Sequence, residues 1–447
     1  MEFTDLCKKI IRIDSSPTEG NEAVALFCAE LCKEVGLEVT LQEGQLSGKK
    51  QYNLLARPKS SSKKREILFQ THLDTVEPGP MGNWTKTGLN PFEAHIEDGK
   101  IYGLGTADVK LDFLCKLRAV KEFAQTQMKS PFVLVGTFGE EVGMHGAQHL
   151  MTTKAIDASK AIIGEPSELQ IVYANNGYLV VDFHVPFTQE EKNFLVRHNG
   201  GDTIMSQEKI FHGKAAHSST PHLGDNAIYK LISYLEKMPE GIAVLAARGG
   251  SAVNTVPADA HVEVDGSTTF NNSTGSRLIK VVKYLQKMER DFMSFNDEQF
   301  SPSHPTVNTG ILNTTTEGVD LKVSFRITPQ ISEAEVEKWI TQMKNFSTAN
   351  KTEFKPERFS PSALTPLESD LVRGAIEIAK SLKLSVKPIT KASGTECSVY
   401  RKYGIECIVF GPGVSIGNSH TANEYNILKQ LDQATEFYAG AVKRFCI

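Results

Sequence analysis

The sequence predicts an α/β protein in which a mixed, mostly parallel sheet is flanked by helices, with a second domain, an α+β sandwich, inserted into it. At 447 residues the chain is too long for one ordinary hydrophobic core, so two domains are expected. Residues 1–172 alternate helical patterns with short apolar runs, and this texture returns after about residue 360. We therefore assign residues 1–174 and 359–447 to one domain and residues 175–358 to the inserted one.

The first domain begins with a helical pattern, and several short apolar runs follow it. Residues 21–35 have apolar positions at helical spacing, and Gly36 is a normal helix end. The continuous apolar runs are typical of strands that helices cover on both faces, as in a largely parallel or mixed sheet. Strands are predicted at 37–41, 53–56, 67–70, 132–138, 161–163 and 405–410, and further helices at 368–382 and 427–445.

The inserted domain has a different pattern. Residues 177–185 and 321–327 alternate apolar and polar side chains, as half-exposed strands do. Amphipathic helices are predicted at 226–238 and 333–346. Strands with helices on one face form an α+β sandwich. The polar stretch 188–207, rich in Asn and Gly, is interpreted as an insertion within this domain.

The overall charge and the cysteines exclude some classes of protein. The 49 basic and 53 acidic residues nearly balance, which argues against nucleic acid or an anionic membrane as the main partner. No apolar run has the length of a signal peptide or of a membrane span. The seven cysteines have no paired spacing, which is typical of reduced packing residues. We predict a cytoplasmic protein.

Histidine and carboxylate side chains follow the predicted strands of the first domain. Ligand sites of open α/β sheets collect at the carboxyl ends of strands. Each motif alone has an ordinary explanation, such as a surface histidine, a glycine-rich turn or acids at a helix start. Together they supply two imidazoles and several carboxylates, the ligands that suit a pair of zinc-like ions. The candidates are His72, Asp74, Asp108, Glu140, Glu141, Glu165 and His420.

Two of these motifs suggest a division of roles. In the His72-Leu73-Asp74 step, alternate side chains share one face, so the Asp74 carboxylate is expected to hold the second nitrogen of His72. Glu140 and Glu141 are adjacent, and their side chains therefore point in different directions. One of them would bind metal while its neighbour faces the substrate.

In order along the chain, these segments resemble metallopeptidase family M20, which includes deacylases and peptidases with two zinc ions. The resemblance implies a zinc-exopeptidase-like sheet with an inserted lid domain, and two zinc ions that cobalt or manganese could replace. It implies that Glu140 is the general base and that Asp74 orients His72. The implied ligands are His72 and Glu165 for one zinc, Glu141 and His420 for the other, and Asp108 between them.

The inserted domain shares a second segment with the family. Residues 213–227 resemble the family's lid motif, which implies that His217 polarises the scissile carbonyl. The match also implies substrate contacts for Asn254, Arg326, Gly394 and Thr395. An arginine fork suits a substrate carboxylate. The residue types alone leave open a helix-cap neighbour for His217 and a sheet-surface salt bridge for Arg326.

The expected reaction is hydrolysis of the amide bond of an N-acyl amino acid, of acetylornithine-deacetylase type. A dipeptidase or carboxypeptidase with the same dinuclear centre is the alternative. A non-catalytic binding protein is disfavoured, because every ligand and Glu140 are present. The resemblance also implies a homodimer through the inserted domain. The sequence departs from the family pattern at residues 109–112 and 396–398, where substrate choice is expected to be affected.

Overall fold

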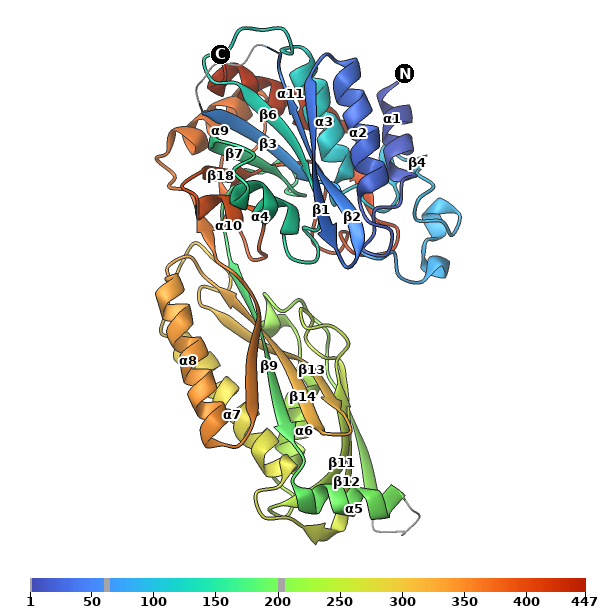
Figure 1. Cartoon of the computed structure of the whole chain (residues 1–447), viewed down its shortest axis with the longest axis vertical. Coiled ribbons are helices and arrows are strands. Elements are labelled where there is room, and N and C mark those ends of the chain that lie inside the picture. The colour runs from blue at the N-terminus through green and yellow to red at the C-terminus, as the bar shows by residue number, and fades with distance from the viewer. Residues whose placement is uncertain (1, 60–64, 200–205) are drawn as a thin grey trace. The chain divides into compact units, whose positions relative to one another are not determined.

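A computed structural model of the chain describes residues 2–59, 65–199 and 206–447. The chain forms two compact units, which are drawn in Figure 1. The first unit comprises residues 1–174, 363–390 and 395–447, and the second comprises residues 175–362 and 391–394. Among the described residues, no helix is long and apolar enough to cross a membrane.

A nine-stranded mixed sheet forms the centre of the first unit. Its strand order is β1-β2-β6-β3-β7-β18-β8-β16, with β17 paired to β8. The four central strands β6, β3, β7 and β18 are parallel, and β1, β2 and β8 join antiparallel. The strands are β1 (Glu38–Leu46), β2 (Lys49–Arg57), β3 (Glu66–His72), β6 (Phe132–Thr137), β7 (Ala158–Gly164), β8 (Val172–Asn175), β16 (Ala363–Leu364), β17 (Ile389–Lys391) and β18 (Glu406–Val409).

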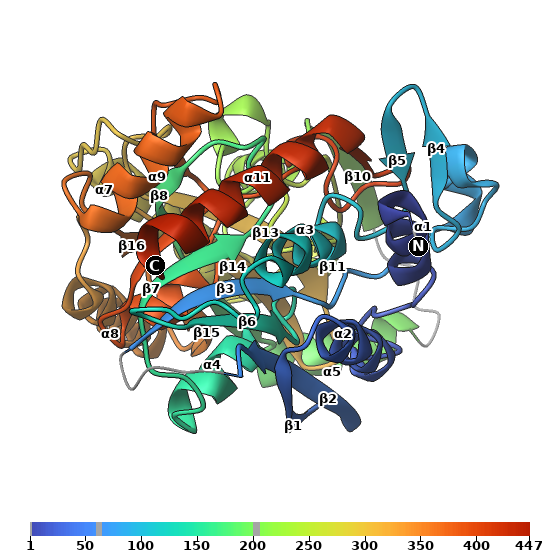
Figure 2. The same ribbon diagram turned by 90° about the horizontal axis from the view of Figure 1, so that it is seen from above.

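Helices cover both faces of this sheet, which explains its continuously apolar strands. Leu68 packs in a cluster with α4 and α10, whereas the neighbouring Phe69 contacts Tyr438 of α11 on the opposite face. Helices α3 and α11 lie side by side over the sheet (Figure 2). The helices are α1 (Phe3–Ile11), α2 (Glu22–Glu34), α3 (Lys110–Lys121), α4 (His145–Thr152), α9 (Asp370–Ser381), α10 (Cys397–Arg401) and α11 (Leu428–Phe445).

Two short 3-10 turns and a small antiparallel sheet complete the first unit. The turns are η1 (Met81–Asn83) and η2 (Thr85–Thr87). The sheet has the order β19-β5-β4. Its strands are β4 (His95–Glu97), β5 (Lys100–Tyr102) and β19 (Tyr425–Ile427), so it joins two segments more than 300 residues apart in the chain.

The second unit is an antiparallel seven-stranded sheet whose apolar core lies against three helices, α6, α7 and α8. The strand order is β10-β12-β11-β13-β14-β9-β15. The strands are β9 (Gly177–Pro186), β10 (Ser206–His212), β11 (Ile242–Gly249), β12 (Asp259–Thr269), β13 (Thr306–Thr314), β14 (Gly318–Ile327) and β15 (Glu353–Ser360). The helices are α5 (Gln189–Asn199), η3 (Pro221–Leu223), α6 (Ala227–Leu235), α7 (Thr274–Phe292) and α8 (Glu333–Ala349).

The predicted fold class is confirmed, and three of the local differences concern the inserted domain and its boundary. The predicted boundary at residue 358 falls inside β15, which continues to Ser360 because it pairs with β9. Helix α7 was not predicted, although its buried residues recur at helical spacing. The polar stretch 188–207 contains α5 and the first residues of β10, while residues 200–205 lie outside the described residues.

Candidate functional site

The four parallel strands carry most of the candidate ligands to one edge of the sheet. His72 is the last residue of β3, and Glu165 follows the last residue of β7. Glu140 and Glu141 lie in the turn after β6, and His420 lies in the loop after β18. Since β6, β3, β7 and β18 are parallel neighbours, their carboxyl ends meet at this edge.

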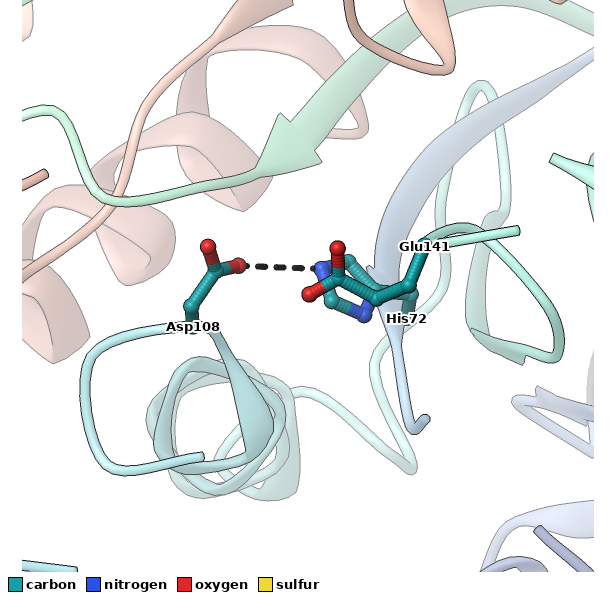
Figure 3. Close-up of side chains that lie close together, drawn as sticks. All are labelled: His72, Asp108 and Glu141. Atoms are coloured by element: carbon teal, nitrogen blue, oxygen red, sulfur yellow. Dashed lines mark hydrogen bonds and ion pairs between the residues drawn. The ribbon is translucent and has the colours of Figure 1, made fainter. Parts of the chain in front are cut away.

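Asp108 lies between the two histidines. Its Oδ1 is 3.2 Å from Nε2 of His72, and its Oδ2 is 3.2 Å from Nε2 of His420. Oε1 of Glu141 is 3.1 Å from the same nitrogen of His420. Figure 3 shows His72, Asp108 and Glu141 pointing toward one another, and their ligand atoms all lie within 4.8 Å. A carboxylate with one oxygen on each histidine is suited to bridge two cations.

A second group of ligand atoms shares His72. The ligand atoms of His72, Glu140 and Glu165 also lie within 4.8 Å of one another. The two groups together bring His72, Asp108, Glu140, Glu141 and Glu165 to one place, and His420 contacts two of them. Thus the structure gathers every metal ligand predicted from the sequence.

Burial makes this cluster electrostatically costly without cations. Burial and the Glu165 carboxylate raise the pKa of Glu140 well above its ordinary value. Burial also raises the pKa of Glu141. Burial opposes the charged form of His420, but hydrogen bonds to Asp108 and Glu141 raise its pKa to about 12. Two imidazoles and four carboxylates at these distances are a donor set that fits two zinc-like ions.

Asp74 contacts His72 through a different atom from the one expected. The atom closest to Nδ1 of His72 is the main-chain oxygen of Asp74, at 3.0 Å, whereas the carboxylate oxygen is 3.7 Å away. The carboxylate instead accepts the backbone N–H groups of Glu140 and Glu141, at 3.2 and 3.1 Å. Asp74 therefore fixes the turn that carries both glutamates as well as the ring of His72.

Glu424 has a role in the site that the sequence did not indicate. Its side chain is buried, and Oε1 accepts the backbone N–H groups of Ala107 and Asp108 at 2.8 and 3.1 Å. Glu424 lies in the same polar loop as His420, and this position was the only sequence signal available. The hydrogen bonds join residues more than 300 apart, which no local pattern reveals.

Residues 109–112, where the sequence departs from the family pattern, include a charged residue that lies buried in the first unit, Asp112. Asp112 and Lys116 are fully buried and form an ion pair of 2.7 Å. The Asp112 carboxylate also accepts the hydroxyl groups of Thr71 (2.6 Å) and Tyr438, and Lys116 donates to the carbonyl oxygen of Gln70 at 2.5 Å. Thr71 precedes His72, so this pair holds the backbone beneath a candidate ligand.

The predicted residues of the second unit lie on neighbouring segments of that unit. Ser218, next to His217, donates its backbone N–H to the carbonyl oxygen of Asn254 at 2.8 Å. Nδ1 of His217 accepts the backbone N–H of Ser219 at 3.2 Å. The Ser219 hydroxyl also lies 2.7 Å from Nδ1. A ring whose Nδ1 accepts from Ser219 carries its proton on Nε2, which is the tautomer that the predicted role as a hydrogen-bond donor requires.

Arg326 is a buried cation on β14, and it contacts neutral groups. Its guanidinium lies 4.1 Å from the ring centre of its cross-strand neighbour Tyr178, and 3.3 Å from the Ser218 hydroxyl. It forms no ion pair with a carboxylate of the described residues. Burial lowers the pKa of Arg326 to about 10. The alternative of a sheet-surface salt bridge is therefore wrong.

Gly394 and Thr395 fall on different units. Gly394 ends the short segment 391–394 of the second unit, and Thr395 begins the last segment of the first. Thr395 is fully buried, and its hydroxyl accepts the N–H of Cys397 at the start of α10. This hydroxyl therefore has a structural partner within the first unit.

Comparison with known proteins identifies the family. The model of peptidase family M20/M25/M40 matches residues 68–444, which is most of the chain. The chain belongs to this family. This is a family of peptidases and deacylases with a dinuclear metal centre, and the ligand groups described above are the candidates for that centre in this chain.

Individual relatives differ in what they hydrolyse. Acetylornithine deacetylase of Proteus mirabilis is 31% identical over 216 residues, which cover 48% of this chain and 47% of that protein. The chain thus spans about half the length of this relative. Aminoacylhistidine dipeptidase of Vibrio alginolyticus shares the fold, with a TM-score of 0.69, 14% identity, and coverage of 99% of this chain and 96% of that one. An M20 metallo-carboxypeptidase of Sulfolobus solfataricus matches with a TM-score of 0.62, 17% identity, and 99% coverage of both chains.

Proposed function

We propose that the protein hydrolyses the amide bond of an N-acyl amino acid at a centre of two zinc ions. The observation that carries this proposal is the group of two histidines and four carboxylates at one edge of the sheet, of which His72, Asp108 and Glu165 are buried. The sequence identity with an acetylornithine deacetylase, over about half of each chain, supports the acyl amino acid as substrate. Arg326, a buried cation without a carboxylate partner among the described residues, is suited to the substrate's carboxylate.

In this proposal the metal-binding residues are His72, Asp108, Glu141, Glu165 and His420. When bound, the two cations supply Lewis acidity to the scissile carbonyl and acidify a water molecule. Glu140 takes a proton from the attacking water as the water oxygen adds to the scissile carbonyl carbon, and it delivers that proton to the amine nitrogen as the C–N bond breaks. Its carboxylate makes no hydrogen bond within the described residues, so it is available for this transfer. His217 donates a hydrogen bond from its Nε2–H group to the developing oxyanion.

A dipeptidase with the same centre is the second candidate. Its support is structural, because the aminoacylhistidine dipeptidase aligns over almost the whole of both chains. The two candidates differ in the leaving group and the acyl group, while the chemistry at the carbonyl is the same.

A hydrolysis panel separates the candidates. The zinc-loaded protein is assayed with N-acetyl amino acids, including N-acetylornithine, against dipeptides with the same carboxyl-terminal residues. We expect higher kcat/KM for the N-acetyl series. Faster hydrolysis of the dipeptides would favour the second candidate, and no hydrolysis of either series would contradict both. Metal analysis of the purified protein should find about two ions per chain, with zinc predominating.

A further inference from the structure

Glu424 connects the loop of Asp108 to the loop of His420. One oxygen of its buried carboxylate receives two consecutive N–H groups, those of Ala107 and Asp108. Its own carbonyl oxygen accepts the N–H of Gly103 at 2.9 Å. The segment 103–108 is therefore attached at both ends to a single residue.

Neighbouring contacts make this attachment rigid. Asn426 donates its side-chain amide to the carbonyl oxygen of Thr106 at 2.8 Å, and β19 pairs with β5. Asn418 bonds both the N–H and the carbonyl oxygen of Tyr425, at 3.0 and 2.9 Å, which closes the loop that contains His420. The two loops thus form one hydrogen-bonded body that presents Asp108 and His420 together.

Stability alone does not account for a carboxylate at position 424. Its side chain is 1% exposed, and its Oε2 has no hydrogen-bond partner among the described residues. A buried carboxyl group with an unsatisfied oxygen weakens a fold. A role in placing the ligand loops explains why the residue is nevertheless there.

We propose that Glu424 is a positioning residue of the metal centre, which fixes Asp108 relative to His420 through the two backbone N–H groups that it accepts. The proposal rests on the assignment of Asp108 and His420 as metal ligands. Groups that orient metal ligands typically contribute 10- to 100-fold to metal affinity, and we expect a contribution of that order, about 10- to 100-fold, from Glu424.

The test measures the zinc dissociation constants of three variants by competition with a chromophoric chelator. Glu424→Gln keeps an acceptor oxygen at the same reach, Glu424→Asp keeps the charge but withdraws it by one methylene, and Glu424→Ala removes both. Positioning predicts that Gln retains most of the affinity, while Asp and Ala lose about 10-fold or more. A purely electrostatic role predicts the reverse order of Gln and Asp, and this order would overturn the proposal. If the Glu424→Ala variant does not fold, the order of zinc affinities of Glu424→Gln and Glu424→Asp still tests the proposal.

Glu191 provides a matched control in the second unit. It is also a buried glutamate that accepts two backbone N–H groups, from Thr188 at 2.8 Å and Thr274 at 2.7 Å. Glu191→Ala should lower the melting temperature and leave zinc affinity unchanged. An equal loss of zinc affinity in Glu191→Ala would show that removing any buried glutamate that accepts two backbone N–H groups weakens zinc binding. The proposal would then fail.

A double-variant cycle separates this proposal from the metal assignment. In an Asp108→Ala background, Glu424→Asp should cost little further zinc affinity, because the residue it positions is gone. Full additivity contradicts positioning. If Asp108→Ala and His420→Ala bind two zinc ions as the unsubstituted protein does, the metal centre itself is misassigned. If those variants lose zinc while Glu424→Asp does not, only the positioning role fails.

Discussion

Each unit buries cations, and Lys116 of the first unit differs from Arg326 of the second in its partners. Lys116 in the first unit is fully buried and paired with Asp112 at 2.7 Å. Arg326 in the second unit contacts a hydroxyl and an aromatic ring, with no carboxylate partner among the described residues. Burial lowers the pKa of both side chains. Removing one member of a buried pair destabilises a fold, whereas a buried charge without a fixed counter-ion is suited to a ligand.

The same contrast holds for carboxylates within the first unit. Asp112 has Lys116, Thr71 and Tyr438 as partners. The Glu140 carboxylate has neither a hydrogen bond nor an ion pair within the described residues. Asp112 thus has partners that place it in the scaffold, whereas Glu140 has none among the described residues and is the proposed base. Substitutions at both kinds of position test this distinction.

The largest effect is expected at Glu140. Glu140→Gln removes the proposed base while it keeps the size of the side chain, and kcat should fall by about 10²- to 10⁴-fold. Metal analysis should still find two ions per chain, and the melting temperature should not fall. Turnover near that of the unsubstituted enzyme would contradict the assignment.

At Asp112 the expected loss is one of stability. Asp112→Ala leaves Lys116 buried without a counter-charge, which should cost about 3–5 kcal/mol of unfolding free energy in urea denaturation. The double variant Asp112→Leu, Lys116→Met should recover much of this loss, because it buries no charge. If Asp112→Ala lowers the unfolding free energy by less than about 1 kcal/mol, the buried pair contributes no more than a surface ion pair does, and the prediction is wrong.

Arg326 should affect substrate binding more than stability. Arg326→Met should raise KM by about 10- to 100-fold, since a hydrogen-bonded charge contributes about 1.5–3 kcal/mol. For a matched substrate whose carboxylate is replaced by an amide, the same substitution should raise KM much less. Stability should be unchanged or higher, because no counter-ion is left unpaired. An equal rise in KM for both substrates would mean that Arg326 supports the structure of the unit and does not bind the substrate carboxylate.

The smallest effect is expected for an exposed pair. Arg12 and Glu93 form a salt bridge of 2.5 Å with side chains 58% and 51% exposed. Arg12→Ala should leave the midpoint of urea denaturation almost unchanged, and any change should be smaller still at high salt, because solvent and ions screen an exposed pair. A loss as large as that of Asp112→Ala would show that burial does not decide the energetics of these pairs.

Much of the first unit could be predicted because its signals are local. Apolar runs such as 67–70 and 132–138 are strands, and the ligands that follow them meet because neighbouring parallel strands end at one edge. Helix α7 also had a local signal, the helical spacing of its buried residues, which the prediction did not use.

The remaining features depend on which atoms meet, and sequence spacing does not contain that information. The Asp74 carboxylate binds the backbone of Glu140 and Glu141, and its main-chain oxygen is the atom nearest to His72. The partners of Asp112 include Tyr438, and those of Glu424 are Ala107 and Asp108. The Asp74 contacts join residues 66 and 67 apart, and the Tyr438 and Glu424 contacts join residues more than 300 apart. All of them arise only when the sheet and its helices are assembled.

The order of the central strands has a consequence for synthesis. Strand β18 lies between β7 and β8, yet it is translated more than 230 residues after them, once the whole second unit has been made. The loop with His420 comes later still. A chain that stops before β18 has three of the four central parallel strands and lacks one histidine of the proposed metal centre. The full set of proposed ligands can therefore come together only after residue 420 has been translated.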